Sequence, residues 1–323
     1  MKGKMKGKLI MTVEQAADRV AWERVRNSGI GGSDIACVMG LNPWKSAFAL
    51  YAEKHGDVEA EDLSNNEYVY WGTVLEQAVA DRFCELTGKK VRKCGTLQDE
   101  SYEFMLANVD RLVVGEDAGL ECKTANGFKA SEWDGDNLPD SYYCQCQWYM
   151  AITGCEKWYI ACLIGGNHFV WKEIPRNDEF IADMRAQAIA FWNNLQNNVA
   201  PEVDGSESTS QTVDKIVASV VGADEVALGT QAAPFIARYH ELAKTEKLVK
   251  EQKQQCQNAL TLMLNGAKCG TFNNYKVINT PTKGREGIDR KKLMKDMPDV
   301  YEKYKTVGKD GFRFSIKEIK QND

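Results

Sequence analysis

The chain has 323 residues, of which 43% are hydrophobic and 27% are charged, and its formal net charge at pH 7 is −5. This length allows two domains, and this composition is typical of a globular protein with a sizeable core. No apolar run reaches the roughly 18 residues that a membrane-spanning helix needs, and the apolar patch at residues 9–11, behind the basic amino terminus, is too short for a signal peptide. We therefore expect a cytoplasmic protein without a membrane partner.

The ten cysteines and three histidines argue against a metal centre built on sulfur or imidazole. The cysteines are scattered, no Cys-x-x-Cys pair occurs, and the histidines are isolated. Zinc and iron–sulfur sites are therefore not expected, and reduced, mostly buried thiols fit a cytosolic chain.

The charge is unevenly distributed along the chain. Residues 243–323 hold 18 Lys and Arg against 10 Asp and Glu, whereas residues 1–242 hold 23 against 36. The basic part can attract phosphate groups, or it can be a solvated lysine-rich surface. An acidic metal site would contribute to the negative balance of the first part.

The amino-terminal part of the chain reads as helices. The capping box Thr12–Gln15 opens a helix that runs to about Val25. A second helix is predicted from Ile35 to Met39, and a third over residues 47–54.

A glycine-bearing turn, Ser28–Asp34, precedes the second of these helices. Because a helix amino terminus offers free N–H groups to an anion, Arg26 and Ser33 can complete a phosphate cradle there. The alternative is a plain capped turn in which Ser33 or Asp34 is the N-cap, and the local residues alone favour this alternative.

A long helix is predicted over Glu67–Thr87, and Gly88 ends it. Glu76 lies next to the apolar stripe of this helix, so it is either an edge residue or a metal-site neighbour that points inward. The stripe is formed by residues at helical spacing, namely Val74 or Leu75, Val79, Phe83 and Leu86.

The next segment alternates strands and helices. This order indicates an α/β to α+β fold, with a mixed sheet that is flanked by helices. Strands are predicted over Lys90–Thr96, Phe104–Val114 and Leu120–Thr124, a helix over Tyr142–Ile152, strands over Lys157–Leu163 and Asn167–Ile174, and a helix over Asn177–Asn198.

A polar stretch at residues 204–210 is predicted to be a linker. It would separate a core domain, residues 1–203, from a helical and strand-containing extension, residues 211–323. Within the extension we expect mostly helix over residues 212–264, a strand over 271–280, short basic helices over 290–305 and a last strand over 311–319.

Two of the predicted strands place acidic residues near each other. If they pair across the turn Gly115–Gly119, Asp110 approaches Glu121 and Lys123, which share one face of their strand. Two carboxylates and the main-chain oxygen of Cys122 make an oxygen-rich pocket suited to Mg²⁺, and Lys123 can position or help to deprotonate a water. This is the chemistry of phosphodiester hydrolysis. The alternative is a solvated strand face, which such short motifs often mark.

Several short motifs, taken in order and at their spacing, resemble one known family. They are Trp22-x3-Arg26-x4-Gly31-Gly-Ser-Asp34, Trp71-Gly-x3-Glu76, Asn108-Val-Asp110, Glu121-Cys-Lys123 and Pro139-x2-Tyr142 leading into Gln145-x3-Tyr149. Over roughly residues 20–200 the chain is similar to the YqaJ-type phage recombination exonucleases, relatives of the phage lambda exonuclease within the PD-(D/E)xK nuclease superfamily.

This resemblance implies a fold, an activity and partners. The fold would be a PD-(D/E)xK, restriction-endonuclease-like core. The activity would be Mg²⁺-dependent, with Mn²⁺ as a substitute, and would degrade one strand of duplex DNA from its end, 5′ to 3′, for recombination by single-strand annealing. The partners would be double-stranded DNA ends, a single-strand annealing protein and further copies of the chain in a toroidal trimer, in the cytosol of a bacterium or a phage-infected host.

The resemblance also assigns roles to individual residues. Two carboxylates and a main-chain carbonyl would bind the metal, a lysine would orient or activate the attacking water, and other polar residues would support the metal or hold the substrate. These are Asp110, Glu121 and the Cys122 carbonyl for the metal, Lys123 for the water, Glu76 in support of the metal, Gln145 with its helical partner Tyr149 at the centre, and Arg26 and Ser33 on the terminal phosphate.

The chain departs from the family pattern in three places. The proline of the superfamily name is absent, since Asn108-Val109 precedes Asp110, and the cysteine spacing does not reproduce the iron–sulfur cluster of some relatives. The extension lies outside the lambda match, and both a basic DNA-guiding arm and an oligomerisation element remain open for it. Two other functions also remain open: an endonuclease of the same superfamily, and a catalytically silent protein that binds DNA ends.

Overall fold

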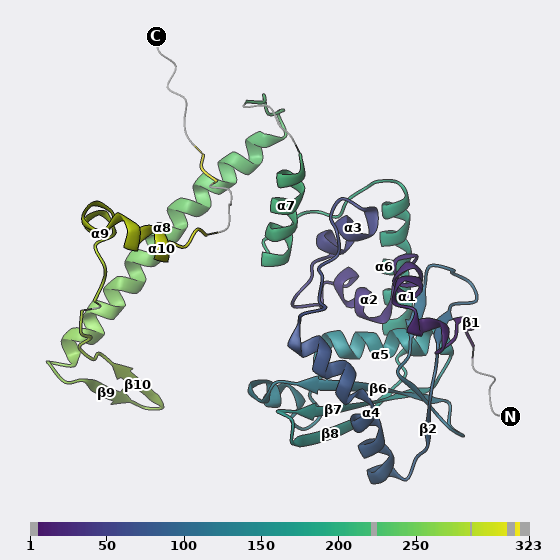
Figure 1. Cartoon of the computed structure of the whole chain (residues 1–323). Coiled ribbons are helices and arrows are strands. Elements are labelled where there is room, and N and C mark those ends of the chain that lie inside the picture. The colour runs from purple at the N-terminus through teal and green to yellow at the C-terminus, as the bar shows by residue number, and fades with distance from the viewer. Residues whose placement is uncertain (1–5, 221–224, 285, 309–313, 317–323) are drawn as a thin grey trace. The chain divides into compact units, whose positions relative to one another are not determined.

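The structure is a computed structural model, and it describes residues 6–220, 225–284, 286–308 and 314–316. The chain divides into two compact units, Met1–Val220 and Val221–Asp323. Figure 1 labels the elements of both. Among the described helices, none combines the length and the apolar character needed to cross a bilayer.

A five-stranded mixed sheet forms the centre of the first unit, with the strand order β2-β5-β6-β7-β8. Strands β6 and β7 run parallel, and the other three neighbouring pairs are antiparallel. The mixed α/β fold expected from the sequence is therefore confirmed. The strands are β2 (Val91–Lys93), β5 (Arg111–Val113), β6 (Ala118–Ala125), β7 (Lys157–Ile164) and β8 (His168–Pro175).

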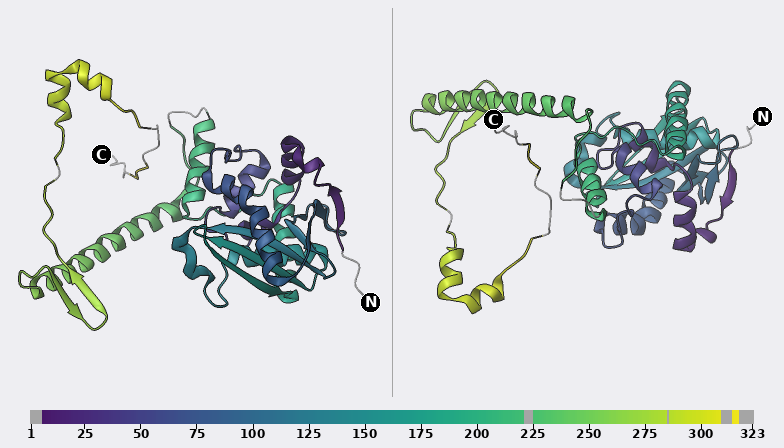
Figure 2. Two further views of the ribbon diagram at one scale, coloured as in Figure 1. Left: turned by 60° about the horizontal axis from the view of Figure 1, so that its bottom comes forward. Right: turned by 90° about the horizontal axis from the view of Figure 1, so that it is seen from above.

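Helices cover both faces of this sheet (Figures 1 and 2). On one face, Phe83 of α4 packs with Leu120 and Tyr159 of the strands. On the other face, α2, α5 and α6 enclose the core around Trp158. The helices of this unit are α1 (Arg19–Asn27), α2 (Gly32–Val38), α3 (Ala47–His55), α4 (Glu67–Thr87), α5 (Asp140–Thr153), α6 (Asp178–Gln196) and α7 (Glu207–Ser219), with the 3-10 helices η1 (Gln15–Ala17) and η2 (Gly127–Trp133).

The alternation of side chains along β6 determines which helix each of its residues meets. Leu120 and Cys122 belong to the cluster under α4. Because successive strand residues point to opposite faces, Glu121 and Lys123 project together toward α5. This confirms the prediction that the Glu-x-Lys pair shares one face.

A smaller antiparallel sheet, in the order β1-β3-β4, adjoins the large one. The strand predicted over residues 104–114 was wrong in its continuity, because β4 belongs to the small sheet and β5 to the large one. The strand predicted over residues 90–96 divides in the same way, between β2 and β3. Asp110 therefore lies where the chain passes from one sheet to the other. The strands of the small sheet are β1 (Lys8–Met11), β3 (Thr96–Gln98) and β4 (Leu106–Asn108).

The first predicted helix is also interrupted. The Thr12–Gln15 capping box forms, with Thr12 N donating to Gln15 Oε1 at 2.8 Å and Gln15 N donating to Thr12 Oγ1 at 3.2 Å. However, it opens only the short helix η1. Helix α1 starts afresh because the Asp18 side chain caps it, accepting from the N–H groups of Val20 and Ala21.

Helix α4 has the predicted bounds. The Asn66 side chain accepts from two N–H groups of its first turn, and Gly88 ends it with a φ of 70°, a left-handed conformation that favours glycine. The predicted stripe is only partly buried: Val79 and Phe83 are in the core, whereas Val74 and Leu86 are exposed. Solvent therefore reaches part of the face that the apolar spacing had indicated.

The division between the two units comes later than the predicted linker at residues 204–210. Residues 207–210 form the first turn of α7, which packs against α3. Thr209 Oγ1 donates to Ser46 Oγ at 2.8 Å, and Ser46 N donates to Ser208 Oγ at 3.2 Å. The polar residues that suggested a linker thus cap α7 and attach it to the first unit.

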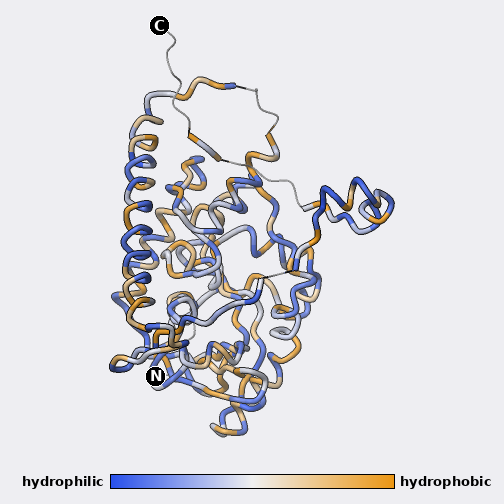
Figure 3. The backbone as a smooth tube through the Cα atoms, turned by 90° about the vertical axis from the view of Figure 1, so that its left-hand side faces the viewer, coloured by the Kyte–Doolittle hydropathy of each residue, from blue (hydrophilic) through white to orange (hydrophobic). Residues whose placement is uncertain are grey.

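The second unit contains the long helix α8 (Ala232–Met263), a hairpin of β9 (Cys269–Phe272) and β10 (Tyr275–Ile278), and the short helices α9 (Arg290–Asp296) and α10 (Pro298–Tyr304). The single strand predicted over residues 271–280 is thus a hairpin. Hydrophilic and hydrophobic residues alternate along α8, none of which is buried (Figure 3). The last predicted strand, residues 311–319, falls largely outside the described residues.

Candidate active site

Two carboxylates meet at the point where the chain enters the large sheet. Asp110 precedes β5, and its Oδ2 accepts from the main-chain N–H of Cys122 at 2.8 Å. Glu121 on β6 is only 2% exposed. Burial, and then the neighbouring Glu121 carboxylate, raise the pKa of Asp110 well above its usual range. Burial also raises the pKa of Glu121, so the site holds two neighbouring carboxyl groups whose ionised forms are both disfavoured when no cation is bound.

Lys123 is the cation that faces this pair. Its Nζ lies 2.6 Å from Glu121 Oε1, and 4.8 Å from the centre of the Tyr142 ring. Burial acts to lower the pKa of Lys123, but the carboxylates of Glu121 and Asp110 outweigh it and raise that pKa above its ordinary value. The two carboxylates thus favour the ammonium form of Lys123, which can donate a hydrogen bond to a water.

Gln145 on α5 fixes one oxygen of Glu121. Its Nε2 lies 2.7 Å from Glu121 Oε1 and 2.7 Å from the hydroxyl of Tyr149, one turn further along the helix. Tyr149 is itself buried against Gly32 of α2, where a Cβ atom would lie 2.6 Å from the tyrosine ring. The structure thus brings Gln145 and Tyr149 into one network with the carboxylates.

The other oxygen of Glu121, Oε2, is buried and receives no hydrogen bond from any described residue. A buried acceptor without a partner is costly, because it has lost its hydration without replacement. An unpartnered carboxylate oxygen beside a second carboxylate is the arrangement expected where a cation binds.

The residues present fit a hard divalent cation. Asp110 and Glu121 supply carboxylate oxygens, and the Cys122 main-chain oxygen is the predicted third ligand. Burial raises the pKa of the Cys122 thiol and so disfavours its thiolate form, and Mg²⁺ prefers oxygen to sulfur as a ligand. Across the described part of the chain, no group of three or more His, Cys, Asp and Glu side chains could hold a metal ion. Main-chain and water oxygens would therefore have to complete the shell, as Mg²⁺ prefers.

Arg111 is a residue of this site that the sequence analysis missed. It is only 3% exposed, and its guanidinium donates to the Glu76 carboxylate, to the main-chain oxygen of Asp110 at 2.7 Å and to Gln77 Oε1 at 3.0 Å. Arg111 therefore joins α4 to the junction that presents Asp110. The signal available in the sequence was an arginine inside an apolar strand, since arginines are rarely buried without a partner.

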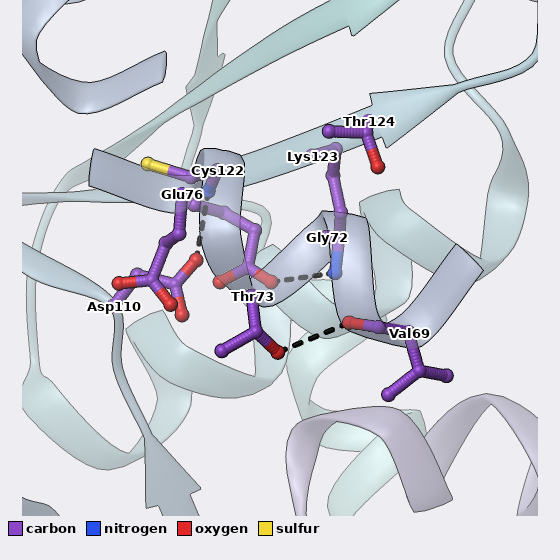
Figure 4. Close-up of a pocket in the computed structure, with 9 residues that line it drawn as sticks. Val69, Gly72, Thr73, Glu76, Asp110, Cys122, Lys123 and Thr124 are labelled. Carbon is purple, nitrogen blue, oxygen red and sulfur yellow. Dashed lines mark hydrogen bonds and ion pairs between the residues drawn. The ribbon is translucent and has the colours of Figure 1, made fainter. Parts of the chain in front are cut away.

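A cavity of about 240 Å³ opens between α4 and β6 (Figure 4). Figure 4 shows the side chains of Glu76 and Asp110 beside each other, with α4 passing close to Lys123. The predicted supporting glutamate thus shares a cavity with the predicted ligands. The cavity is lined by Val69, Gly72, Thr73, Glu76, Asp110, Glu121, Cys122, Lys123 and Thr124.

The two residues predicted to hold a terminal phosphate lie on α1 and α2. Ser33 is exposed in the first turn of α2, while Arg26 lies over the Trp22 ring at 5.4 Å. In the part of the chain that the structure describes, no hydrogen bond or ion pair joins Arg26 to Ser33 or to the carboxylates. The phosphate cradle therefore stays a prediction.

The predicted N-cap of α2, Ser33 or Asp34, was wrong. Gly31 occupies that position, and its N–H donates to Asp34 Oδ2 at 3.1 Å. Asp34 also pairs with Lys54 Nζ at 3.0 Å in a buried ion pair, and Lys54 donates to the Gly29 carbonyl at 2.6 Å. The side chain that was expected to cap the helix instead holds the turn in front of it.

Comparison with known proteins identifies the family. A model of the YqaJ-like viral recombinase domain matches residues 21–156. A protein named YqaJ from Bacillus subtilis (strain 168) is 38% identical over 315 residues, which are 96% of this chain and 98% of that protein. Protein D345L of African swine fever virus (strain Badajoz 1971 Vero-adapted) is 40% identical over 70 residues, 21% of this chain and 20% of its own length.

Among solved structures, an alkaline exonuclease from Laribacter hongkongensis is similar with a TM-score of 0.48 and 22% identity, covering 55% of this chain and 93% of that one. The match to the Bacillus protein, in contrast, extends over nearly the whole of both chains. The motifs that indicated a YqaJ-type chain lie within or close to the residues that the family model matches. The chain belongs to the YqaJ family, which carries the YqaJ-like viral recombinase domain.

Proposed function

We propose that this chain is a Mg²⁺-dependent exonuclease that degrades one strand of linear duplex DNA from its end, in the 5′ to 3′ direction. One observation carries the proposal: a buried oxygen of Glu121 receives no hydrogen bond from any described residue, although Asp110 lies beside it and Lys123 Nζ lies 2.6 Å from the other oxygen of Glu121. The viral recombinase domain of the family supports a role in DNA recombination by single-strand annealing.

Each residue of the network has a defined task in this reaction. Asp110, Glu121 and the Cys122 main-chain oxygen would hold Mg²⁺, for which Mn²⁺ could substitute. When bound, the ion polarises a phosphoryl oxygen and lowers the pKa of a coordinated water. Lys123, charged beside Glu121, donates a hydrogen bond that orients the attacking water and offsets negative charge on the phosphate.

The surrounding residues keep this arrangement fixed. Gln145 occupies Glu121 Oε1, so that only Oε2 is left for a cation. Arg111 holds Glu76 and the Asp110 main chain. Groups that are held in place before the reaction lose little entropy during it, which is how positioning contributes to catalysis.

A cleavage assay tests the proposal. A 5′-phosphorylated linear duplex is incubated with the protein, with and without Mg²⁺, beside the variants Asp110→Asn and Lys123→Ala. The matched control is Lys129→Ala, because Lys129 is half exposed and its one ion pair among the described residues is with Glu132 on η2. We expect Mg²⁺-dependent release of nucleotides, a loss of about 100-fold or more in both site variants, and no change in the control.

Other outcomes separate the alternatives. Cleavage of a closed circular duplex would indicate an endonuclease, and binding of DNA ends without Mg²⁺-dependent cleavage would indicate a silent end-binding protein. Release that is undiminished in both site variants would overturn the mechanism. Comparison of 5′-labelled and 3′-labelled duplexes measures the direction of digestion independently of the family.

The phosphate cradle and the partners are further parts of this proposal. Arg26 and Ser33 would hold the terminal phosphate, since an enzyme that degrades ends contacts backbone phosphates and not bases. Ser33→Ala should then reduce the preference for 5′-phosphorylated over 5′-hydroxyl ends and leave the response to Mg²⁺ intact. The family resemblance also supports a ring-shaped trimer and a single-strand annealing protein as a partner, which light scattering and co-purification would test.

A further inference from the structure

A long stretch of the second unit is free of acidic side chains. Between Glu251 and Glu286 the sequence contains four lysines and one arginine but no Asp or Glu, in a chain that has 46 acidic residues. These five basic residues give the stretch a net positive charge, and it contains no acidic side chain that could neutralise them. Its positive charge attracts polyanions and repels other cationic molecules.

The β9–β10 hairpin lies within this acid-free stretch and ends in two aromatic residues. Phe272 and Tyr275 are directly opposite each other in the register, on either side of the turn Asn273–Asn274. Residues opposite each other in an antiparallel pair share one face of the hairpin. Both residues are exposed, Phe272 to 73% and Tyr275 to 69%, so two aromatic side chains are accessible on one side of the tip.

Strand β9 packs against the carboxyl-terminal end of α8, whereas the two aromatic residues at the tip have no such contact among the described residues. A Cβ atom at Gly270 would lie 2.8 Å from the Leu264 side chain, so the backbone of β9 packs closely on the end of the helix. Among the described residues, no aromatic ring or cation contacts Phe272 or Tyr275. Lys276 follows Tyr275 on β10 and is exposed, and Lys268 is exposed at the other end of the hairpin, just before β9.

We propose that this hairpin tip binds single-stranded nucleic acid. Aromatic rings stack on bases whatever the sequence, and Lys276, which follows Tyr275, would neutralise a phosphate of the bound strand. A duplex would not fit as well, because its base faces already stack on one another, whereas a single strand offers them. The role of the hairpin would be to hold the strand that digestion leaves, and this role rests on the proposed exonuclease. Binding itself requires no cleavage.

The test measures binding by the full chain in EDTA, where no divalent cation supports cleavage. The ligand is a fluorescein-labelled oligothymidylate of about 20 nucleotides, which is longer than the roughly 4–16 nucleotides that one OB fold covers. Binding is measured by fluorescence anisotropy. Phe272→Ala and Tyr275→Ala should each raise the Kd by about ten-fold. Tyr275→Phe keeps the ring, and should bind like the wild type. Far-UV circular dichroism and the Tm show that each variant is folded.

Two controls separate stacking from other effects. Leu262→Ala removes an aliphatic side chain that is 80% exposed on α8, and it should leave the Kd unchanged. Because binding is measured in EDTA, it does not depend on cleavage, so a failure of the proposed nuclease is distinguishable from a failure of this site. Lys276→Ala should lower the salt dependence of binding.

Three results would overturn the proposal. The first is an unchanged Kd in the double variant Phe272→Ala/Tyr275→Ala. The second is an equal loss of affinity for the single strand and for a blunt duplex, which would remove the argument from free base faces. The third is a change in the oligomeric state of these variants on size-exclusion chromatography with no change of their Kd for the oligonucleotide, which would assign the tip to a protein contact.

Discussion

The burial of the Asp110 carboxyl group destabilises the fold, but it places a carboxylate where a cation can bind. Its raised pKa means that the folded chain binds a proton more tightly at this carboxyl than the unfolded chain does. The ionised carboxylate therefore destabilises the fold at neutral pH. This deficit decreases as the pH falls through the raised folded pKa, and it is absent below the unfolded pKa of about 3.9.

We predict that Asp110→Asn raises the Tm in EDTA at pH 7, and that its advantage over the wild type disappears as the pH falls toward 4. Mg²⁺ should reverse the order. At about 100 times its Kd it adds roughly 2.7 kcal/mol to the wild type, but little to a variant that lacks one of the two carboxylates. Asp214→Asn, an exposed acid on α7, should change neither curve. A lower Tm of Asp110→Asn in EDTA would contradict the assignment.

Arg111 makes a second prediction at this scale. It holds three oxygens from a buried position, so its replacement by methionine leaves the Glu76 carboxylate and the Asp110 carbonyl without a donor. We expect Arg111→Met to lower the free energy of unfolding by about 2–4 kcal/mol and to weaken the rise of the Tm with Mg²⁺. Urea unfolding and a Mg²⁺ titration followed by the Tm measure the two effects.

The control for this prediction is also on α4. Arg82→Met breaks an exposed pair with Glu85, and it should cost less than about 0.5 kcal/mol. Arg111→Lys keeps the positive charge but lacks the planar guanidinium group, so it should recover only part of the free energy of unfolding that Arg111→Met loses. If Arg111→Met were as stable as Arg82→Met, Arg111 would have no positioning role.

At the scale of elements, the crossing of α2 and α5 determines where Gln145 lies. Gly32 touches the Tyr149 ring so closely that a Cβ atom would come within 2.6 Å of it. We predict that Gly32→Ala destabilises the chain by about 1–3 kcal/mol. It should also reduce cleavage, because a displaced Tyr149 takes Gln145 with it. Gly31→Ala is the matched control, since its Cβ atom would meet nothing closer than Asp34 Oδ2 at 3.7 Å.

Much of the candidate site could be predicted from local rules. The two-residue period of a strand places Glu121 and Lys123 together whatever the rest of the fold, and the four-residue helical spacing does the same for Gln145 and Tyr149. Arg111 could not be found in this way. Its partners are on a helix about 35 positions earlier in the chain, and no local period reports such a contact.

The interruptions of predicted elements have the same explanation. A run of apolar residues indicates a strand but not the sheet that it joins, so the break at Asp110 is invisible until β4 and β5 pair with different neighbours. Likewise, polar residues are typical of linkers and of helix caps alike, and only the hydrogen bonds to Ser46 show that residues 207–210 serve the second purpose.

For the whole molecule, the two units divide the proposed tasks. The family-matched residues 21–156 and every residue of the candidate site belong to the first unit, whereas the acid-free stretch and its aromatic hairpin belong to the second. The first unit carries more acidic than basic residues, which would favour a cation at the proposed site, and the second carries more basic than acidic residues, which would favour the proposed polyanionic ligand. A chain without the second unit should therefore keep cleavage and lose single-strand binding.

This division can be tested with two truncations that differ only by the segment containing α7. A chain of residues 1–220 should unfold cooperatively and retain Mg²⁺-dependent cleavage of a duplex end. A chain of residues 1–203 lacks the partners of Ser46 and uncovers the face of α3 on which Thr209 and Thr212 are buried. We expect it to be less stable by about 2 kcal/mol, from the lost hydrogen bonds alone. Thermal unfolding of both chains compares the two boundaries. Equal Tm values would favour the boundary after residue 203, whereas a lower Tm for the shorter chain would assign α7 to the catalytic unit.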